Sequence, residues 1–372
     1  MGDHVFSCYA SAAFGTEGLV AGELKAFHLR DVRAENGGVR FSADQAGLYA
    51  ANIRSRFSDR IFVILAESPC TSFEDLFQLV GSIPWENYAA GTEKINISAK
   101  CSRSRLMSPR DCQSVSKKAV IERLKKSGIA RFPETGAELP VLISVRSDHA
   151  KVLLNTSGAA LSRRGYRTWN GEAPLRETLA AALVELSPWK PGLPLHDPCC
   201  GTCTILVEAA MHACGMAPCL NRSFAMDGFV WADRETLESV RQEIRNQVSL
   251  PPSLMISGSD IDPEALKLSE KHIHQAGLDG LVSVFPCPLQ NLLCEGANGV
   301  FICNPPYGER MSDRESCRRL YRDLHSLLDR HPGWSLCAIT SDPAFERSFG
   351  KRASAKRRLY NGRLECTFYI YG

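Results

Sequence analysis

The sequence lacks long apolar runs. No stretch approaches the ~18 apolar residues that a membrane-spanning helix needs, and the amino terminus has no charged region followed by an apolar segment and a cleavage site. Membrane insertion and secretion therefore have no support, and we expect a cytoplasmic protein. With 372 residues the chain is too long for one ordinary domain, so two or three domains are expected.

Disulfide frameworks and metal-ligand patterns are missing as well. The 15 cysteines are scattered through apolar segments of a long chain and do not frame a small scaffold, so we expect reduced thiols. Cys200 and Cys203 have the C-x-x-C spacing found in zinc sites, but no second pair of ligands accompanies them. We therefore expect no metal.

Acidic residues are scarce in two segments. Residues 94–131 contain eleven Lys or Arg and two acids, and residues 351–363 contain six Lys or Arg and no acid, although the net charge of the chain is only +3. Such local fields attract a polyanion, and nucleic acid is the expected partner; the alternative is a solvated helix face with structural ion pairs. The candidate contacts, including three arginines that follow the first segment, are Lys100, Arg103, Arg105, Lys117, Lys118, Arg123, Arg163, Arg164 and Arg167.

Strand-like and helix-like segments alternate along the whole chain, without repeats or low-complexity tracts. From residue 193 onward the alternation predicts a mostly parallel, doubly wound α/β domain. The longest insertion in that domain, residues 219–250, contains Phe229 and Trp231 as candidate packing anchors. The predicted parts are a small α+β unit (1–60), a second α+β module (61–160), a helical connector (161–192) and the α/β domain (193–372).

The tetrapeptide Asn304-Pro305-Pro306-Tyr307 follows an apolar run that predicts a buried parallel strand. Ligands of open α/β sheets bind beyond the carboxyl ends of such strands. The two prolines remove two backbone donors and stiffen the turn, which leaves the Asn304 amide and the Pro305 carbonyl as hydrogen-bond acceptors. With the flat ring of Tyr307, these acceptors suit the exocyclic amine of a nucleobase; the alternative is an ordinary proline-rich strand exit.

Two earlier strand ends are candidates for cofactor binding. Residues 197–204 lead from a predicted strand into a helix, whose amino terminus favours a negative group such as a carboxylate. The only glycine in this loop is Gly201, so a plain strand-to-helix turn is the alternative. After the next strand, Asp260 is placed to accept hydrogen bonds from ribose hydroxyls, whereas Asp262 is expected to cap a helix.

These three strand ends, in this order, resemble the motifs of class I S-adenosylmethionine-dependent methyltransferases, and the NPPY form resembles enzymes that methylate base amino groups. Further segments resemble the THUMP-domain RNA methyltransferases of bacteria over essentially the whole chain: DCQS at 111–114, RRGYR at 163–167, LNRSF at 220–224, NPPYGER at 304–310 and LYNGRLEC at 359–366. The resemblance implies a ferredoxin-like segment, a THUMP domain and a Rossmann-like catalytic domain with a mostly parallel seven-stranded sheet. It also implies S-adenosylmethionine as cofactor and guanine N2 of 23S ribosomal RNA as the target class.

The resemblance also implies roles for individual residues. The catalytic residues would be Asn304, Pro305, Pro306 and Tyr307, and the cofactor-binding residues would be Asp197, Cys199, Gly201, Thr204, Asp260, Ile261 and Asn304.

Two departures from the family pattern affect the cofactor. Cys199 and Cys203 replace a Phe and a Gly of the first motif, and we expect the Cβ of Cys203 to crowd the methionine carboxylate. The acid expected after the third strand falls at Pro288, so that Gln290 or Asn291 would have to bind the adenine amine.

Two other functions stay open. Adenine N6 methylation of RNA or DNA uses an amine that suits the same motif. Alternatively, the altered cofactor loop has abolished catalysis, and the protein is an RNA-binding or ribosome-assembly factor.

Overall fold

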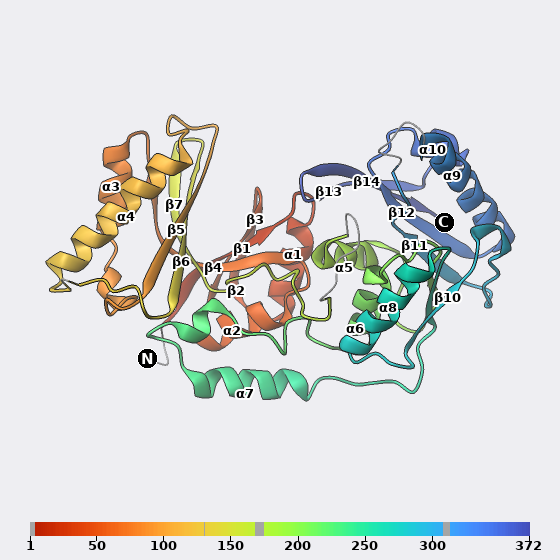
Figure 1. Ribbon diagram of the computed structural model, residues 1–372, viewed down its shortest axis with the longest axis horizontal. Helices are drawn as coiled ribbons and strands as arrows, with labels where there is room; N and C mark the ends of the chain where they lie inside the picture. The colour runs from red at the N-terminus through yellow and green to blue at the C-terminus, as the bar shows by residue number, and fades with distance from the viewer. Residues whose placement is uncertain (1–3, 130, 168–174, 308–312) are drawn as a thin grey trace. The chain divides into compact units, whose positions relative to one another are not determined.

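The chain forms two compact units in the computed structural model, which describes residues 4–129, 131–167, 175–307 and 313–372 (Figure 1). The first unit comprises Met1–Ala12, Val20–Leu161 and Asn221–Glu243. The second unit comprises Ala13–Leu19, Ser162–Leu220 and Ile244–Gly372. Each unit therefore contains segments that are far apart in the sequence.

The first unit is built on one seven-stranded sheet with the order β2-β3-β1-β4-β7-β6-β5. Its strands are β1 (Phe6–Ala12), β2 (Arg30–Glu35), β3 (Gly38–Ala43), β4 (Ser58–Pro69), β5 (Lys94–Ser102), β6 (Glu138–Arg146) and β7 (His149–Asn155). The helices here are α1 (Glu17–Ala26), α2 (Gln45–Arg54), α3 (Phe73–Gly81), α4 (Pro109–Lys126) and α7 (Arg234–Arg245), with the 3-10 turns η1 (Trp85–Asn87) and η2 (Ala225–Gly228). The start of α1 and the last two residues of α7 are assigned to the second unit. Because β1 pairs with β4, the two predicted amino-terminal modules share this sheet.

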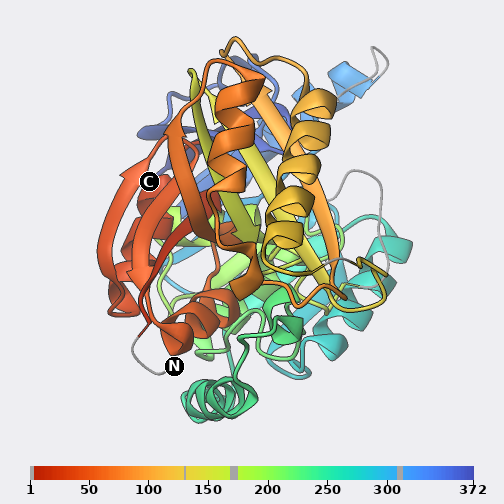
Figure 2. The same ribbon diagram turned by 90° about the vertical axis from the view of Figure 1, so that its left-hand side faces the viewer.

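Helices α3 and α4 lie side by side over the part of the sheet made by β4 to β7 (Figure 2). The Ser72 hydroxyl and the Asp75 carboxylate cap the start of α3 reciprocally, and Ser108 caps α4 just before Pro109. Helix α4 buries small and apolar residues such as Ala119 and Val120, which leaves its many cations on the outer surface. This packing explains how a strongly basic segment can still fold as an amphipathic helix.

The second unit is built on another seven-stranded sheet, with the order β10-β9-β8-β11-β12-β14-β13. Its strands are β8 (Leu195–Asp197), β9 (Ile256–Asp260), β10 (Val282–Pro286), β11 (Gly299–Cys303), β12 (Trp334–Thr340), β13 (Ala355–Asn361) and β14 (Leu364–Tyr371). The helices are α5 (Glu177–Leu186), α6 (Thr204–Ala213), α8 (Pro263–Gln275), α9 (Asp313–Arg330), α10 (Phe345–Phe349) and the 3-10 turn η3 (Leu289–Asn291). The first five strands of the order are parallel, and the β13–β14 hairpin is antiparallel.

Helices cover both faces of this sheet (Figure 1). Along β11, Val300 and Ile302 join a core with residues of α5, α6 and α8, whereas Phe301 and Cys303 join a second core with residues of α9 and α10. A strand buried on both faces needs the continuous apolar sequence seen at β11. The carboxyl ends of β8, β9 and β11 consequently lie at one edge of a rigid, two-sided core.

The predicted fold class is confirmed: α+β modules precede a Rossmann-like domain with a mostly parallel sheet. Two segments fall on the other side of the predicted domain limits: Ala13–Leu19 belong to the second unit, and Asn221–Glu243 belong to the first unit. In that unit, Trp231 packs against Phe6 and Phe229 with ring centroids 5.1 and 5.4 Å apart, so both predicted anchors pack within that unit. Residues 168–174 of the predicted connector and 308–310 of the extended motif lie outside the described residues. Within the part of the chain that the structure describes, no helix is long and apolar enough to cross a membrane.

Candidate active site of a methyltransferase

The loop between β8 and α6 is held in place by β9 and α8. The Cys200 N–H donates to the Ser259 carbonyl at 3.0 Å, and the Gly201 N–H donates to Asp260 Oδ2 at 2.8 Å. From α8, the Ser269 hydroxyl donates to the Gly201 carbonyl at 2.7 Å. The loop is therefore a preformed cradle rather than a turn that a ligand must order.

A cavity of about 430 Å³ opens at this cradle. Five of the predicted site residues line it: Asp197, Cys199, Gly201, Thr204 and Asn304. Asn304 reaches the cavity because β11 pairs directly with β8, so the ends of these two strands are neighbours. The structure thus brings the predicted cofactor loop and Asn304 of the predicted catalytic turn to one cavity. The other predicted site residues are not part of its lining: Asp260, Ile261, Pro305, Pro306 and Tyr307.

The shape of the loop at Gly201 fits a ligand that approaches the backbone closely. Gly201 has φ +50°, and a Cβ added there would meet no atom within 4 Å, because it would enter open space. The loop leads straight into α6, whose amino terminus favours a carboxylate. The residues present therefore fit the methionine end of S-adenosylmethionine.

The expected crowding by Cys203 does not occur. Cys203 is in the left-handed region with φ +68°, and its side chain is fully buried in the core with Leu206 and does not line the cavity. The left-handed backbone explains why a glycine is usual at this position. The Cys203 side chain therefore takes up no space in the cavity where the methionine carboxylate would lie.

Asp197 is a buried carboxyl group on the cavity wall. Burial raises the pKa of the Asp197 carboxyl well above its usual range, the Cys199 N–H at 3.0 Å acts in the opposite direction, and the negative charge of Asp260 raises it further. No Lys or Arg forms an ion pair with Asp197 among the residues that the structure describes. A cationic group entering the cavity would find its natural partner here.

Asp260 is tied into the loop, but its carboxylate keeps unused lone pairs. Oδ2 accepts from Gly201, and Oδ1 accepts from the Asp262 N–H at 3.0 Å. Each carboxylate oxygen can accept a second hydrogen bond, which leaves Asp260 able to bind ribose hydroxyls. The adjacent Ile261 is 77% exposed, and Asp262 accepts from the Glu264 N–H as the predicted helix cap.

The residues after β10 do not replace the expected acid. Gln290 donates to Asp323 of α9 at 2.7 Å, and Asn291 is exposed on η3. Neither they nor Pro288 line the cavity. The expectation that Gln290 or Asn291 binds the adenine amine therefore has no support in the geometry.

The turn after β11 places the Asn304 amide at the cavity. Asn304 lines the cavity, and its Oδ1 accepts a hydrogen bond from the Tyr307 hydroxyl. Tyr321 of α9 donates to the Pro306 carbonyl at 3.1 Å, whereas the Pro305 carbonyl has no donor among the described residues. Because burial raises the pKa of Tyr307, the phenol stays neutral and holds the Asn304 amide in a fixed orientation. The second lone pair of Asn304 Oδ1 remains for a substrate.

Two predicted RNA contacts are corrected by the structure. The Arg164 side chain is 0% exposed and pairs with the equally buried Glu208 at 3.4 Å, and Tyr166 donates to the same carboxylate at 3.1 Å. Arg167 is 5% exposed and pairs with Glu177 at 3.2 Å. Both arginines form buried ion pairs within the unit and cannot reach a phosphate, whereas Arg163 is exposed.

The difference between neighbouring arginines is testable. Arg164→Ala should lower the free energy of unfolding by about 3–5 kcal/mol, because Glu208 would be left buried without its cation. Arg163→Ala should change it by less than about 0.5 kcal/mol, as is usual for an exposed residue. Urea denaturation of both variants measures this. Equal effects would show that the Arg164–Glu208 pair does not stabilise the fold.

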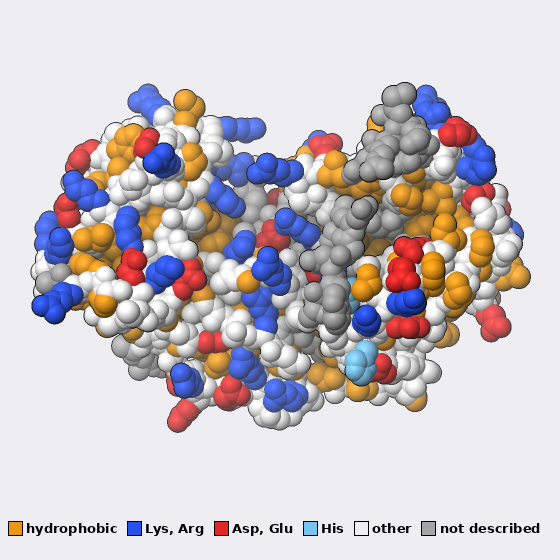
Figure 3. All heavy atoms as spheres, viewed as in Figure 1, with side chains coloured by type: hydrophobic (Ala, Val, Ile, Leu, Met, Phe, Trp, Pro, Cys, Tyr) orange, Lys and Arg blue, Asp and Glu red, His pale blue; other side chains and the backbone are white. Residues whose placement is uncertain are grey.

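The basic module of the first unit contains both exposed and engaged cations. Lys117 donates to the Ile95 carbonyl and to Glu134, both at 2.7 Å, and the Arg123 guanidinium forms a two-pronged contact with Glu86. These two predicted contacts are thus occupied within the unit. Four of the predicted contacts in this module are exposed and suited to bind a phosphate: Lys100, Arg103, Arg105 and Lys118, the last of which also lies 3.8 Å from Glu122. Figure 3 shows Lys and Arg side chains spread over the surface of this unit.

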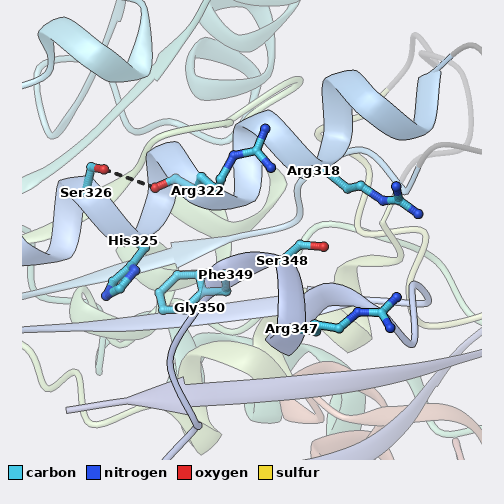
Figure 4. Close-up of a pocket in the computed structure, with 8 residues that line it drawn as sticks. All are labelled: Arg318, Arg322, His325, Ser326, Arg347, Ser348, Phe349 and Gly350. Atoms are coloured by element: carbon cyan, nitrogen blue, oxygen red, sulfur yellow. Dashed lines mark hydrogen bonds between the residues drawn. The ribbon is translucent and has the colours of Figure 1, made fainter.

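A second hollow of about 650 Å³ lies between α9 and α10 and differs in chemistry from the first (Figure 4). Arg318, Arg322 and His325 of α9 and Arg347 of α10 line it. Its lining carries no carboxylate that could hold an ammonium or a ribose. It is therefore not the cofactor site but adds positive potential to the catalytic unit. No group of His, Cys, Asp or Glu that could hold a metal ion occurs in the described ranges.

Fold and site together define a class I S-adenosylmethionine-dependent methyltransferase. The family model described as "RMKL-like, methyltransferase domain" matches residues 164–370, "RlmL ferredoxin-like domain" matches 7–62, and "THUMP domain" matches 70–155. The chain belongs to this family of THUMP-domain RNA methyltransferases, uses S-adenosylmethionine and acts on RNA.

Similar proteins share nearly the whole chain. "Putative RNA methyltransferase YpsC" of Bacillus subtilis is 34% identical over 98% of this chain and 96% of its own length. "Ribosomal RNA large subunit methyltransferase K/L" of Shewanella amazonensis is 32% identical over 99% of this chain and 53% of its own length, so the chain spans about half of that relative. A crystal structure of "SMU.472, a putative methyltransferase complexed with SAH" superposes with a TM-score of 0.92, at 36% identity, over 99% of this chain and 98% of that one.

Proposed function

We propose that this protein transfers a methyl group from S-adenosylmethionine to the exocyclic N2 amine of a guanine in 23S ribosomal RNA. The observation that carries the proposal is the convergence of Asn304 and the cofactor loop on one cavity. The relatives named as large-subunit ribosomal RNA methyltransferases support the choice of RNA, although this chain covers only about half of their length.

Residues at three strand ends would hold the cofactor. The buried Asp197 carboxylate would pair with the ammonium of the methionine part, and the backbone N–H groups that begin α6 would receive its carboxylate. Asp260 would accept from the ribose hydroxyls, with the exposed Ile261 offering an apolar surface to the adenine. When bound, the cofactor supplies an already activated methyl group, so the protein needs neither a metal nor a covalent nucleophile.

The NPPY turn would orient the target amine. Asn304 Oδ1 and the Pro305 carbonyl would accept the two amine hydrogens, which directs the nitrogen lone pair away from both acceptors and toward the methyl donor. The hydroxyl of Tyr307 keeps the Asn304 amide from rotating. Correct placement of this kind supplies a large part of enzymatic rate enhancement. The base must leave its stack to enter the cavity, since an amine inside a helix cannot be reached.

Methylated-nucleoside analysis tests the proposal. Purified protein is incubated with labelled S-adenosylmethionine and transcribed 23S RNA, and the RNA is then digested and its nucleosides are separated. N2-methylguanosine is the expected product. N6-methyladenosine would favour the second candidate, adenine methylation. This candidate is considered because a similar structure from Listeria monocytogenes is described as a "predicted N6-adenine-specific DNA methylase". Cofactor binding without any methylated RNA would contradict both.

The loop between β5 and α4 should provide salt-dependent RNA binding. Removing Arg103 and Arg105 together should reduce the slope of log affinity against log salt concentration by about 2, or about 1 for each lost phosphate contact. Fluorescence anisotropy with a 23S RNA fragment over a salt series measures it. Removing Arg30 and Arg33, two exposed cations of β2 in the same unit, is the matched control and should leave the slope nearly unchanged. Equal slopes for both double variants would contradict this assignment.

A further inference from the structure

The exposed ring of Phe14 belongs to a small cluster on the second unit. Phe14 is 46% exposed, and its ring meets Tyr360 edge to face at 5.6 Å and 86°. The Arg358 guanidinium lies 5.5 Å from the centre of the Phe14 ring. An exposed aromatic ring accompanied by a guanidinium is the combination that stacks nucleobases and holds the neighbouring phosphate.

The short turn that carries Phe14 is fixed on strand β13. Thr16 donates through both its N–H and its hydroxyl to the Ala13 carbonyl, at 3.0 and 2.8 Å. Gly15 has φ +89°, and a Cβ added there would lie 2.6 Å from the Arg358 carbonyl oxygen, so only glycine allows this approach. A close backbone contact thus fixes the turn that carries Phe14, and the ring is held in an exposed position.

The cluster lies at the catalytic edge of the sheet. Thr340, the last residue of β12, pairs with Thr367, whereas Tyr360 pairs with Glu365, so the tip of the β13–β14 hairpin extends past the carboxyl end of β12. Asn304 follows β11 at this same edge, since β11 and β12 are parallel. Within the hairpin, the Cys366 thiol, which pairs in register with Leu359, neighbours the Tyr307 hydroxyl.

Exposed cations of β13 flank the cluster, and one carboxylate, Glu17, accepts from the Gly15 N–H at 2.8 Å. β13 is the edge strand of the sheet, and its consecutive residues Lys356, Arg357 and Arg358 are all exposed. Lys356 is engaged with Glu346 at 2.5 Å, and Tyr360 donates to Glu365 at 2.5 Å, which fixes the ring against which Phe14 packs. A positive edge with one fixed, exposed aromatic face therefore fits single-stranded RNA.

We propose that Phe14, Tyr360 and Arg358 form a stacking platform for a base that flanks the target nucleotide, with Arg358 on the adjoining phosphate. This inference rests on the proposed function and adds a recognition element to it. By holding a neighbouring base, the platform would keep the strand open while the target base occupies the cavity. The binding energy that Phe14 contributes should come from stacking and should not depend on salt concentration. The binding energy that Arg358 contributes should come from a phosphate contact and should fall as the salt concentration rises.

The experiment uses the full chain and a 12-nucleotide single-stranded RNA of mixed sequence with a central 2-aminopurine, whose fluorescence falls on stacking. Phe14→Ala should weaken binding about tenfold at every salt concentration and remove the quenching. Phe14→Trp should restore both. Arg358→Ala should instead reduce the salt slope by about 1. The matched control is Leu193→Ala. Leu193 is an exposed apolar residue that precedes β8, so it lies at the edge of the sheet opposite to the cluster.

Steady-state methylation of 23S RNA separates this inference from the proposed function. For Phe14→Ala, the KM for RNA should rise about tenfold while the affinity for S-adenosylmethionine and the melting temperature stay at the wild-type values. If the wild type methylates RNA but Phe14→Ala matches Leu193→Ala, the platform is refuted and the proposed function stands. A parallel loss of cofactor affinity and melting temperature would show Phe14 to be a packing residue and would also refute it. Failure of the wild type to methylate RNA would overturn both.

Discussion

Asn304→Ala should lower kcat for methyl transfer by roughly 10²–10³-fold, the loss typical of removing one positioned hydrogen-bonding group from an active site. The reason is geometric, because the amide oxygen at the end of β11 is the acceptor that both lines the cavity and is oriented by Tyr307. Affinity for RNA should be retained, since the proposed phosphate contacts lie elsewhere. Single-turnover methyl transfer, with RNA binding measured separately, checks the expectation.

Three further variants define what the Asn304 result means. Asn304→Asp keeps an acceptor oxygen and should be less impaired than Asn304→Ala. Tyr307→Phe removes only the hydroxyl that orients the amide, so an intermediate loss of about tenfold is expected, which corresponds to about 1.4 kcal/mol. Asn291→Ala removes an exposed amide outside the cavity and should behave as the wild type. Full turnover by Asn304→Ala would remove the basis of the proposed mechanism.

The strand-end residues were predictable because their placement follows from local pattern. An apolar run such as the one ending at Cys303, bounded by turn residues, predicts a buried strand, and the carboxyl ends of parallel strands share an edge. This rule is enough to place Asn304 near Asp197 and Gly201 from the sequence alone. The neighbourhood of the loop was also predictable, although not the direction of the Cys203 side chain, which depends on a single left-handed residue.

The remaining features depend on contacts between distant segments, and no local pattern reports these. Arg164 and Arg163 are adjacent and chemically identical, yet one is buried against Glu208, 44 residues away, and the other is exposed. Strand β13 was hidden because its exposed, basic residues look like a solvated segment, and only pairing with β14 makes it a strand. Phe14 carried no signal for the same reason, since its partners Arg358 and Tyr360 are more than 340 residues further along the chain.

Asp197→Asn should separate stability from cofactor binding. In the folded protein without cofactor, the pKa of Asp197 is raised well above its unfolded value, so its protonated form is favoured and its ionised form destabilises the fold. The contribution of the protonated Asp197 to the free energy of unfolding is fully present at pH values below the unfolded pKa of about 3.9. It is lost as the pH rises through the raised pKa of the folded protein. Asn imitates the protonated group and can still accept from Cys199. The free energy of unfolding at pH 8 should therefore increase, by about 1.4 kcal/mol for each unit of the pKa shift.

The same substitution should weaken S-adenosylmethionine binding by about 2 kcal/mol or more, roughly thirtyfold, because the ammonium would lose its buried carboxylate. For the wild type, affinity should fall as the pH is lowered below the raised pKa of Asp197, since the cation must then displace a proton, and this pH dependence should disappear in the variant. Calorimetric titrations with S-adenosylmethionine and urea denaturation, both from pH 5 to 8, measure the two effects. Asp262→Asn is the matched control for stability, because this exposed helix cap works as well with an amide. If the variant is less stable than the wild type at pH 8, the ionised Asp197 stabilises the loop. If the variant binds the cofactor as well as the wild type, Asp197 does not pair with the ammonium.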